Sequence, residues 1–183
     1  MPEETTPSFY EIETKAQETA RHLVESLSRK RLTLALAESC TAGLVADLLA
    51  QSSGASAVLW GSFVCYTPDA KKRMLGLDGN YLEQYGLVSK ETARAMALHA
   101  LEQSGASFAA AVTGIAGPLS DKSDTPVGTV WTAVAWPGNC REKELHFQGT
   151  RAAIRMQAAA AVVKEMLDIV NLPLDKKKNN GVE

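Results

Sequence analysis

Residues 32–43 read L-T-L-A-L-A-E-S-C-T-A-G, a mostly apolar run that ends in polar and small residues. The apolar part, residues 32–37, is bounded by charged residues and predicts a buried strand, although a run this short also fits a buried segment of helix. The residues that follow, L-V-A-D-L-L-A-Q at 44–51, predict a helix. A strand, a tight turn and a helix in this order are a building unit of α/β folds.

The neighbouring segments continue this alternation of helices and strands. Before the central strand, apolar residues at spacings of three and four predict an amphipathic helix over residues 11–29. After it, residues 58–66 are rich in β-branched and aromatic residues, which favour a strand. Thr67 as N-cap, Pro68 at the first helical position and Gly76 as terminator then predict the next helix.

The second half of the chain ends in a hairpin and a long helix. The turn between the two hairpin strands is indicated by Pro137-Gly138-Asn139. The predicted elements are a helix at 89–103, a strand at 108–113, strands at 127–136 and 142–148, and a helix at 151–170.

The order of elements, α-β-α-β-α-α-β-β-β-α, predicts the fold class. Strands that alternate with helices favour a parallel sheet covered on both faces, and the late hairpin adds antiparallel strands. We therefore expect a single three-layer α/β/α domain over residues 11–170, with a mixed, mostly parallel sheet that ends in a hairpin. Residues 1–10 are expected to be flexible, and residues 171–183 to form a flexible polar tail.

Composition excludes several classes of protein. The 183 residues are 45% apolar and carry a net charge of −2, which suits a globular protein and gives no basic footprint for nucleic acid. Cys40, Cys65 and Cys140 form neither a disulfide nor a zinc pattern, so we expect no metal and no other cofactor. The N-terminal residues are polar, and no apolar run reaches the length of a membrane span. We expect a cytoplasmic protein that does not bind a membrane; a homo-oligomer is left open.

Polar residues gather where the predicted strands end. Ligands of open α/β sheets bind beyond the carboxyl ends of the strands. Three such ends are polar, namely A-E-S-C-T-A-G at 37–43, C-Y-T-P-D-A-K at 65–71 and V-T-G-I-A-G-P at 112–118. These three segments are therefore the candidates for a binding or catalytic site.

Ser39 is the candidate nucleophile, because a side chain at a strand-to-helix turn is exposed and meets the positive end of the helix. The backbone N–H groups of Thr41, Ala42 and Gly43 are candidate donors to an oxyanion or a phosphate. The alternative is that Ser39 or Thr41 merely caps the helix, and the turn considered alone favours that interpretation.

A serine nucleophile requires a base. The histidines, His22, His99 and His146, are predicted on helices or inside a strand, away from the three polar segments. Lys71 is the next candidate, because it and Tyr66 can face one crevice. A lysine base needs burial or a nearby cation to lower its pKa from about 10.4.

Two structural alternatives apply to these segments. Lys71 and Lys72 can form a solvated helix face, and without further observations that interpretation is favoured. The third segment supplies Thr113, Gly114 and Gly117. Its glycines allow close approach of the backbone to a ligand, but the segment also fits an ordinary loop.

Six blocks of the sequence, in this order, resemble the C-terminal domain of the CinA (competence/damage-inducible) family over roughly residues 11–170. The blocks are A-E-S-C-T-A-G, G-S-F-V-C-Y-T-P-D-A-K, Val88-Ser89, V-T-G-I-A-G-P, P-V-G-T-V-W and F-Q-G-T-R-A-A-I-R. The resemblance implies the reaction of the stand-alone nicotinamide-nucleotide amidases of that family. They hydrolyse nicotinamide mononucleotide to nicotinate mononucleotide and ammonia, without a metal.

The resemblance also implies roles for individual residues. Ser39 would be the nucleophile, Lys71 its base, and Tyr66 an assisting group. Arg151 would lie at the site, where a guanidinium also suits the substrate phosphate. The other predicted substrate-binding residues are Thr41, Ala42, Gly43, Thr113 and Gly114.

Three departures from the family pattern keep other interpretations open. The family usually has Gly-Gly at Ala42-Gly43, Y-S-N at residues 66–68 and G-D-R at residues 149–151. A second interpretation is therefore a nucleotide-binding or regulatory module with weak or no turnover. A third is an enzyme that uses the Cys40 thiol, although adjacent side chains at a strand end point opposite ways, so that only Ser39 or Cys40 should face the crevice.

Overall fold

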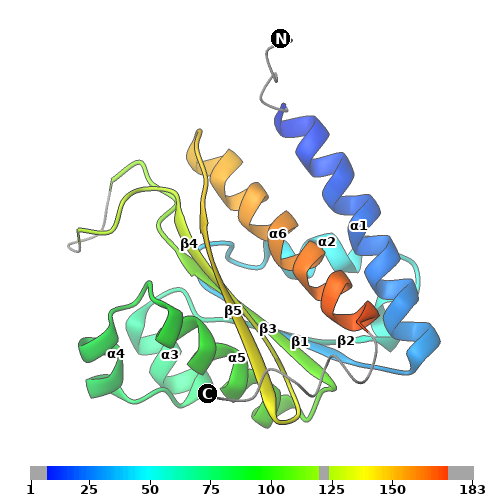
Figure 1. The fold of residues 1–183 in the computed structure, drawn as a ribbon, viewed down its shortest axis with the longest axis horizontal. Helices are drawn as coiled ribbons and strands as arrows, with labels where there is room; N and C mark the ends of the chain where they lie inside the picture. The colour runs from blue at the N-terminus through cyan, green and yellow to red at the C-terminus, as the bar shows by residue number, and fades with distance from the viewer. Residues whose placement is uncertain (1–7, 120–123, 173–183) are drawn as a thin grey trace.

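The computed structural model describes residues 8–119 and 124–172, which form one three-layer α/β/α unit (Figure 1). Residues 1–10 and 171–183 were expected to be flexible. Residues 1–7 and 173–183 lie outside the described residues, whereas Phe9, Tyr10 and Asn171 belong to helices. In chain order the elements are α1 (Phe9–Lys30), β1 (Leu34–Glu38), α2 (Leu44–Ala50), the 3-10 turn η1 (Ala55–Ala57), β2 (Leu59–Val64), α3 (Pro68–Leu75), α4 (Gly79–Tyr85), α5 (Lys90–Ser104), β3 (Phe108–Gly114), β4 (Thr129–Trp136), β5 (Asn139–His146) and α6 (Arg151–Asn171).

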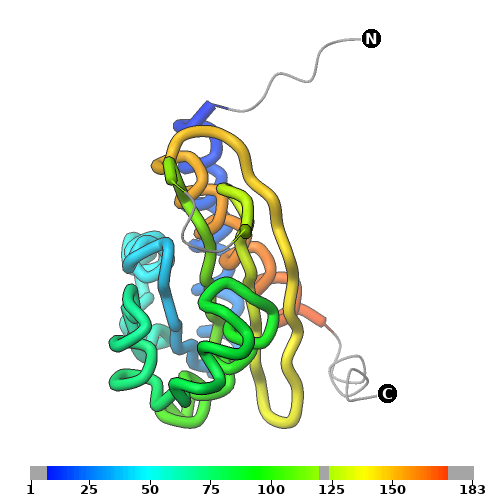
Figure 2. Tube along the Cα trace, turned by 90° about the vertical axis from the view of Figure 1, so that its left-hand side faces the viewer, coloured from blue at the N-terminus to red at the C-terminus, as the bar shows by residue number. Residues whose placement is uncertain are grey.

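The sheet has the order β2-β1-β3-β4-β5. β1 pairs in parallel with β2 and with β3, whereas β4 is antiparallel to both of its neighbours. Four of the five strands therefore run in one direction, and the β4–β5 hairpin lies at one edge of the molecule (Figure 2). The predicted fold class, a mixed and mostly parallel sheet that ends in a hairpin and is covered by helices on both faces, is confirmed.

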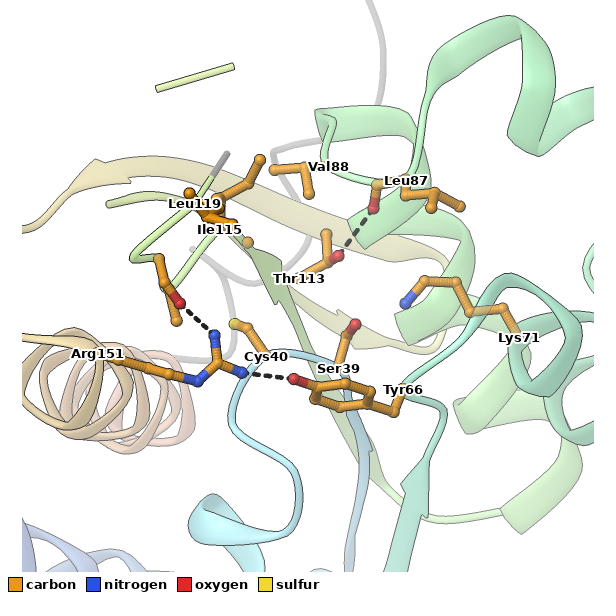
Figure 3. A pocket seen from close by; sticks show the side chains of 13 residues that line it. Ser39, Cys40, Tyr66, Lys71, Leu87, Val88, Thr113, Ile115, Leu119 and Arg151 are labelled. Atoms are coloured by element: carbon orange, nitrogen blue, oxygen red, sulfur yellow. Dashed lines mark hydrogen bonds between the residues drawn. The ribbon is translucent and has the colours of Figure 1, made fainter. Parts of the chain in front are cut away.

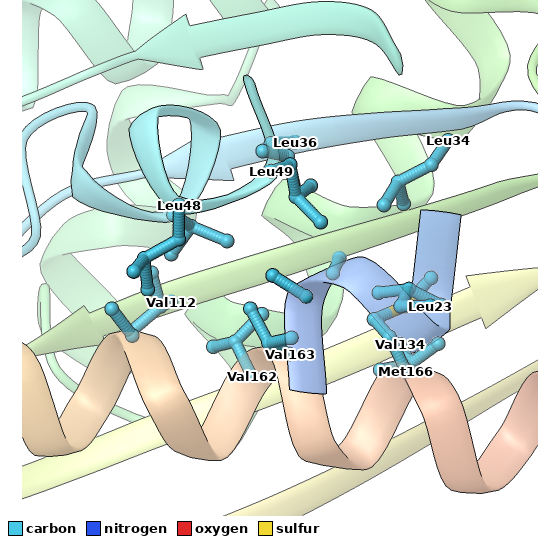
Figure 4. Packing of buried hydrophobic residues seen from close by; sticks show 14 of the residues in the cluster. Leu23, Leu34, Leu36, Leu48, Leu49, Val112, Val134, Val162, Val163 and Met166 are labelled. Carbon is cyan, nitrogen blue, oxygen red and sulfur yellow. The ribbon is translucent and has the colours of Figure 1, made fainter. Parts of the chain in front are cut away.

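The alternation of large and small apolar residues along β1 explains how both faces of the sheet are covered. Leu34 and Leu36 point toward α1, α2 and α6 and pack there with Val112 of β3 and Val134 of β4 (Figure 4). The opposite face, under α3, α4 and α5, is lined by alanines. They are Ala35, Ala37, Ala109, Ala111, Ala133 and Ala135. Because an alanine side chain ends at Cβ, α5 can pack close to the sheet.

Several boundaries differ from the sequence-based prediction. Helix α1 begins at Phe9, because Ser8 and Glu11 form a reciprocal capping box, so it starts two residues earlier than expected. Helix α4 was missed: it is one short segment, capped by Asp78, with Leu82 as its buried residue. Asn139, predicted in the turn, is already the first residue of β5.

Among residues 8–119 and 124–172, no helix is both long and apolar enough to cross a membrane.

Substitution of Gly128 tests the packing at the start of β4. It has a φ of +92°, and a Cβ placed there would lie 1.9 Å from the backbone oxygen of Phe147. Gly128→Ala should therefore lower the free energy of unfolding by about 3 kcal/mol or more, from overpacking and left-handed strain together. Urea unfolding measures this loss.

Gly138→Ala in the β4–β5 turn is the matched control. Gly138 also has a positive φ, +78°, but no atom lies within 4 Å of the position of its Cβ. Only backbone strain applies there, so the loss should be about 1 kcal/mol. Equal losses in the two variants would contradict the packing argument.

Candidate active site

A cleft of about 250 Å³ lies where β1, β2 and β3 end, and we call it the Ser39 cleft. Most of the predicted site residues line it, from four separate segments of the chain (Figure 3). Its lining residues are Ser39, Cys40, Tyr66, Lys71, Leu87, Val88, Thr113, Gly114, Ile115, Ala116, Gly117, Leu119 and Arg151. The carboxyl ends of the parallel strands thus meet in one site, as expected for an open α/β sheet.

Glu38, the last residue of β1, holds the turn that carries Ser39. Its carboxylate is only 1% exposed. It accepts hydrogen bonds from five donors between 2.8 and 3.1 Å. These are the Thr41 hydroxyl, the N–H groups of Gly43, Val45 and Ala46, and the Ser62 hydroxyl. Glu38 therefore supplies the capping of α2 that the alternative interpretation assigned to Ser39 or Thr41. The local sequence carries no signal for this role, because Glu38 precedes Leu44, the first residue of α2, by six residues and reaches the helix only in the folded turn.

Thr41, Ala42 and Gly43 are not brought to the Ser39 cleft, whose lining in the described chain includes none of them. The Gly43 N–H donates to Glu38 at 2.9 Å, and the Ala42 N–H donates to the backbone oxygen of Ser39 at 3.1 Å. The Thr41 side chain is fully buried. The amides of Ala42 and Gly43, which the sequence assigned to an anion, instead hold the turn together.

Ser39 and Cys40 both line the cleft, which corrects the expectation that only one of them would face it. The strand ends at Glu38, so the alternation of side chains along β1 no longer applies at these two residues. Burial raises the pKa of the Cys40 thiol to about 11. The thiol is therefore protonated at neutral pH and is a poor nucleophile.

Lys71 is buried, whereas its neighbour Lys72 is exposed. Thr67 caps α3 by accepting the Ala70 N–H at 3.1 Å, and Pro68 occupies the first position of the helix. This start directs Lys71 inward, where it is 1% exposed and Nζ donates to the backbone oxygen of Cys65 at 3.2 Å. Burial lowers the pKa of Lys71. The lowered pKa therefore comes from burial rather than from a neighbouring cation.

Arg151, the first residue of α6, spans the mouth of the cleft. Its guanidinium donates to the Tyr66 hydroxyl and to the backbone oxygen of Gly117. In Figure 3, Arg151 and Lys71 approach from opposite sides, with Ser39 and Cys40 between them. Tyr66 is 51% exposed, so its ring stands at the entrance.

Thr113 and Gly114 form a wall of the cleft at the end of β3. The Thr113 hydroxyl donates to the backbone oxygen of Leu87 at 2.8 Å and so ties β3 to the segment before α5. A Cβ on Gly114 would lie 2.7 Å from Val130 Cγ2 and 2.8 Å from the Thr129 oxygen. Glycine is therefore required at residue 114 for close packing against β4, which is a structural role.

The histidines do not line the Ser39 cleft in the described part of the chain. His99 Nδ1 is hydrogen-bonded to the backbone oxygen of Leu75 at 2.8 Å, which is a structural contact. Within residues 8–119 and 124–172, no group of three or more His, Cys, Asp or Glu side chains is arranged to hold a metal ion.

Comparison with models of protein families identifies the family of this chain. Residues 16–170 match the model described as the CinA C-terminal domain. The chain belongs to the CinA family. Among curated proteins, a CinA-like protein of Syntrophomonas wolfei is 44% identical over 148 residues, covering 81% of this chain and 34% of the relative. One from Geobacter metallireducens is 46% identical over 132 residues, covering 72% and 32%. The chain thus spans about a third of the length of these relatives.

Solved structures of the family share the fold. The competence/damage inducible protein of Agrobacterium tumefaciens is 40% identical, with a TM-score of 0.82 over 86% of this chain and 96% of that chain. A CinA superfamily protein of Escherichia coli is 30% identical, with a TM-score of 0.82 over 85% and 91%. The predicted family is confirmed, and the names of these relatives specify no reaction.

Two of the three departures from the family pattern fit the local structure, and the third, Ala42, is strained. Pro68 stands at the first position of α3, where a helix needs no N–H donor. Thr150 caps α6 by accepting the Ala153 N–H at 3.3 Å. Ala42 has a φ of +52°, a left-handed conformation that costs about 1–2 kcal/mol for alanine.

The lowered pKa of Lys71 predicts how stability depends on pH. Between the folded-state pKa and the unfolded value near 10.4, the unfolded chain binds one more proton, so stability rises with pH by about 1.4 kcal/mol per unit. Lys71→Met removes this term. The variant should be more stable than wild type near neutral pH, with an advantage that shrinks as the pH approaches 10. Urea unfolding at several pH values measures the difference.

Lys72→Met is the control, because Lys72 is exposed. Its stability should follow that of wild type at every pH. A constant difference between Lys71→Met and wild type across this range would show that burial does not lower the pKa of Lys71.

Proposed function

We propose that this chain is an amidohydrolase that converts nicotinamide mononucleotide to nicotinate mononucleotide and ammonia. The observation that carries the proposal is the meeting of Ser39 with a fully buried lysine, Lys71, in one cleft at the strand ends. A hydroxyl beside an amine of lowered pKa is the arrangement required for a serine nucleophile with a lysine base.

Ser39 and Lys71 would act in two steps. Ser39 Oγ attacks the carboxamide carbon while neutral Lys71 accepts the hydroxyl proton. Lys71 passes this proton to the departing nitrogen, the C–N bond breaks, and ammonia leaves an ester on Ser39. Water then attacks the ester, its proton goes to Lys71, and Lys71 returns a proton to Ser39 Oγ as nicotinate mononucleotide leaves.

The developing oxyanion needs a fixed donor near Ser39. The amides of Ala42 and Gly43 already have acceptors inside the turn. We assign the role to the N–H of Cys40, the residue after the nucleophile, because Cys40 lines the same cleft. This donor position recurs in other hydrolases with a serine at a strand-to-helix turn.

Arg151 and Tyr66 would bind the remote part of the substrate. Arg151 lies at the mouth of the cleft and at the first position of the long helix α6, where a phosphate is favoured by the guanidinium fork. Tyr66 is held against Arg151 through its hydroxyl and would assist from the entrance. An apolar wall that includes Val88 and Ile115 suits the pyridine ring.

Ammonia release from nicotinamide mononucleotide tests the assignment of the nucleophile and the base. Ser39→Ala should abolish turnover, whereas Cys40→Ala should keep most of it, because the buried thiol is protonated. Lys71→Arg should be nearly inactive, since an arginine cannot accept the proton. Wild-type activity should fall as the pH drops below the lowered pKa of Lys71, because the ammonium form is not a base. Loss of activity in Cys40→Ala, with activity retained in Ser39→Ala, would overturn the assignment of Ser39 as the nucleophile.

Two controls separate this enzyme from a binding module. Nicotinamide riboside lacks the phosphate and should have a much lower kcat/KM than the mononucleotide. Arg151→Ala should narrow this difference in kcat/KM between the two substrates. A wild-type protein that binds the mononucleotide and releases no ammonia at any pH would instead be a nucleotide-binding member of the family.

A further inference from the structure

Arg155 contacts the turn that carries the nucleophile, although it does not line the Ser39 cleft in the described part of the chain. Its Nε donates to the backbone oxygen of Cys40 at 3.1 Å, and its second terminal nitrogen donates to the backbone oxygen of Thr41 at 2.6 Å. One guanidinium thus binds two successive carbonyl groups. Charge-assisted hydrogen bonds of this kind are stronger than those between neutral groups.

The contact with Thr41 continues toward Ser39. The oxygen that accepts from Arg155 belongs to the peptide between Thr41 and Ala42, and the N–H of that same peptide donates to the Ser39 oxygen at 3.1 Å. Hydrogen bonds in such a chain polarise one another. Arg155 therefore strengthens the bond that holds the Ser39 carbonyl group.

The direction of the Ser39 carbonyl sets the direction of the Cys40 N–H. Both groups belong to one planar trans peptide, so they point opposite ways. Holding the Ser39 oxygen against the Ala42 N–H aims the Cys40 N–H away from the interior of the turn. That N–H is the donor assigned above to the oxyanion.

Arg155 and Glu38 hold the turn in complementary ways. The Glu38 carboxylate binds N–H and hydroxyl groups that follow Ser39, whereas the Arg155 guanidinium binds the carbonyl groups. Arg155 also lies one helical turn after Arg151 on α6. The same rigid helix therefore carries the proposed phosphate ligand and the group that fixes the nucleophile turn.

We propose that Arg155 is a positioning residue, which orients Ser39 and the Cys40 N–H for attack on the substrate carbonyl without touching the substrate. The proposal rests on the proposed function for its reaction. It predicts an effect on transition-state stabilisation rather than on substrate binding, because the oxyanion forms only during the reaction.

Arg155→Met should lower kcat for nicotinamide mononucleotide about 10²-fold, as expected for a small misplacement of reacting groups, with KM changed little. The acid limb of the pH profile should stay in place, because Lys71 is untouched. Arg155→Lys should keep part of the activity, and guanidinium ions should partly restore Arg155→Ala but not Ser39→Ala. Arg73→Met removes an exposed arginine, 80% exposed in its ion pair with Asp69, and should match wild type.

Circular dichroism distinguishes positioning from stability alone. The proposal would be overturned if kcat per folded molecule were unchanged in Arg155→Met. It would also be overturned if unfolding fully explained the loss of activity and guanidinium ions did not restore it.

A substrate-independent measurement separates this proposal from the proposed function. A fluorophosphonate reacts with an activated serine and needs the same oxyanion donor. If wild type is labelled at Ser39 but releases no ammonia, the substrate assignment fails. In that case, labelling of Arg155→Met about 10²-fold slower than wild type would still support the positioning role. Equal labelling rates in Arg155→Met and wild type would overturn it. A wild-type protein that is neither labelled nor active would overturn both.

Discussion

The buried carboxylate of Glu38 is the interaction on which the site depends. It ends the central strand and joins the turn at residues 39–43, the start of α2 and Ser62 of β2 through five hydrogen bonds. A carboxylate with this little exposure is costly to bury unless donors surround it. Because the donors come from three segments, the carboxylate fixes the turn relative to the sheet. Ser39 is thereby held at the strand end, and α2 begins where it does.

Lys71 has the opposite environment. It is as buried as Glu38, but its described hydrogen bond is to a neutral backbone oxygen, and none of the ion pairs found among the described residues includes it. Burial without an anion lowers the pKa of an amine. The site thus combines a fully hydrogen-bonded acid, which shapes the turn, with a base that is disfavoured as a cation. In the proposed reaction, Glu38 therefore has a structural role and Lys71 a chemical one.

Much of this arrangement follows from local patterns in the sequence, and the remainder depends on tertiary contacts. The alternation of helices and strands predicts the layers, and the polar residues at three strand ends predict the location of the cleft. Whether Lys71 faces solvent or the cleft depends on how α3 packs, which no local pattern decides. The same holds for Glu38: five donors converge on it only once β2 and α2 are in place, so the turn amides looked available to an anion. Helix α4 was missed because seven residues with one buried leucine carry too weak a periodicity.

The central claim is that burial disfavours the ammonium form of Lys71 in the cleft that it shares with Ser39. Nitrogen-15 NMR of the lysine side chains, with the Lys71 signal assigned by its loss in Lys71→Arg, measures this protonation state directly. We predict that the Lys71 signal changes from the ammonium to the amine form at a lower pH than the ordinary value for a lysine side chain, about 10.4. A Lys71 signal that titrates at the ordinary value of about 10.4 would contradict this claim.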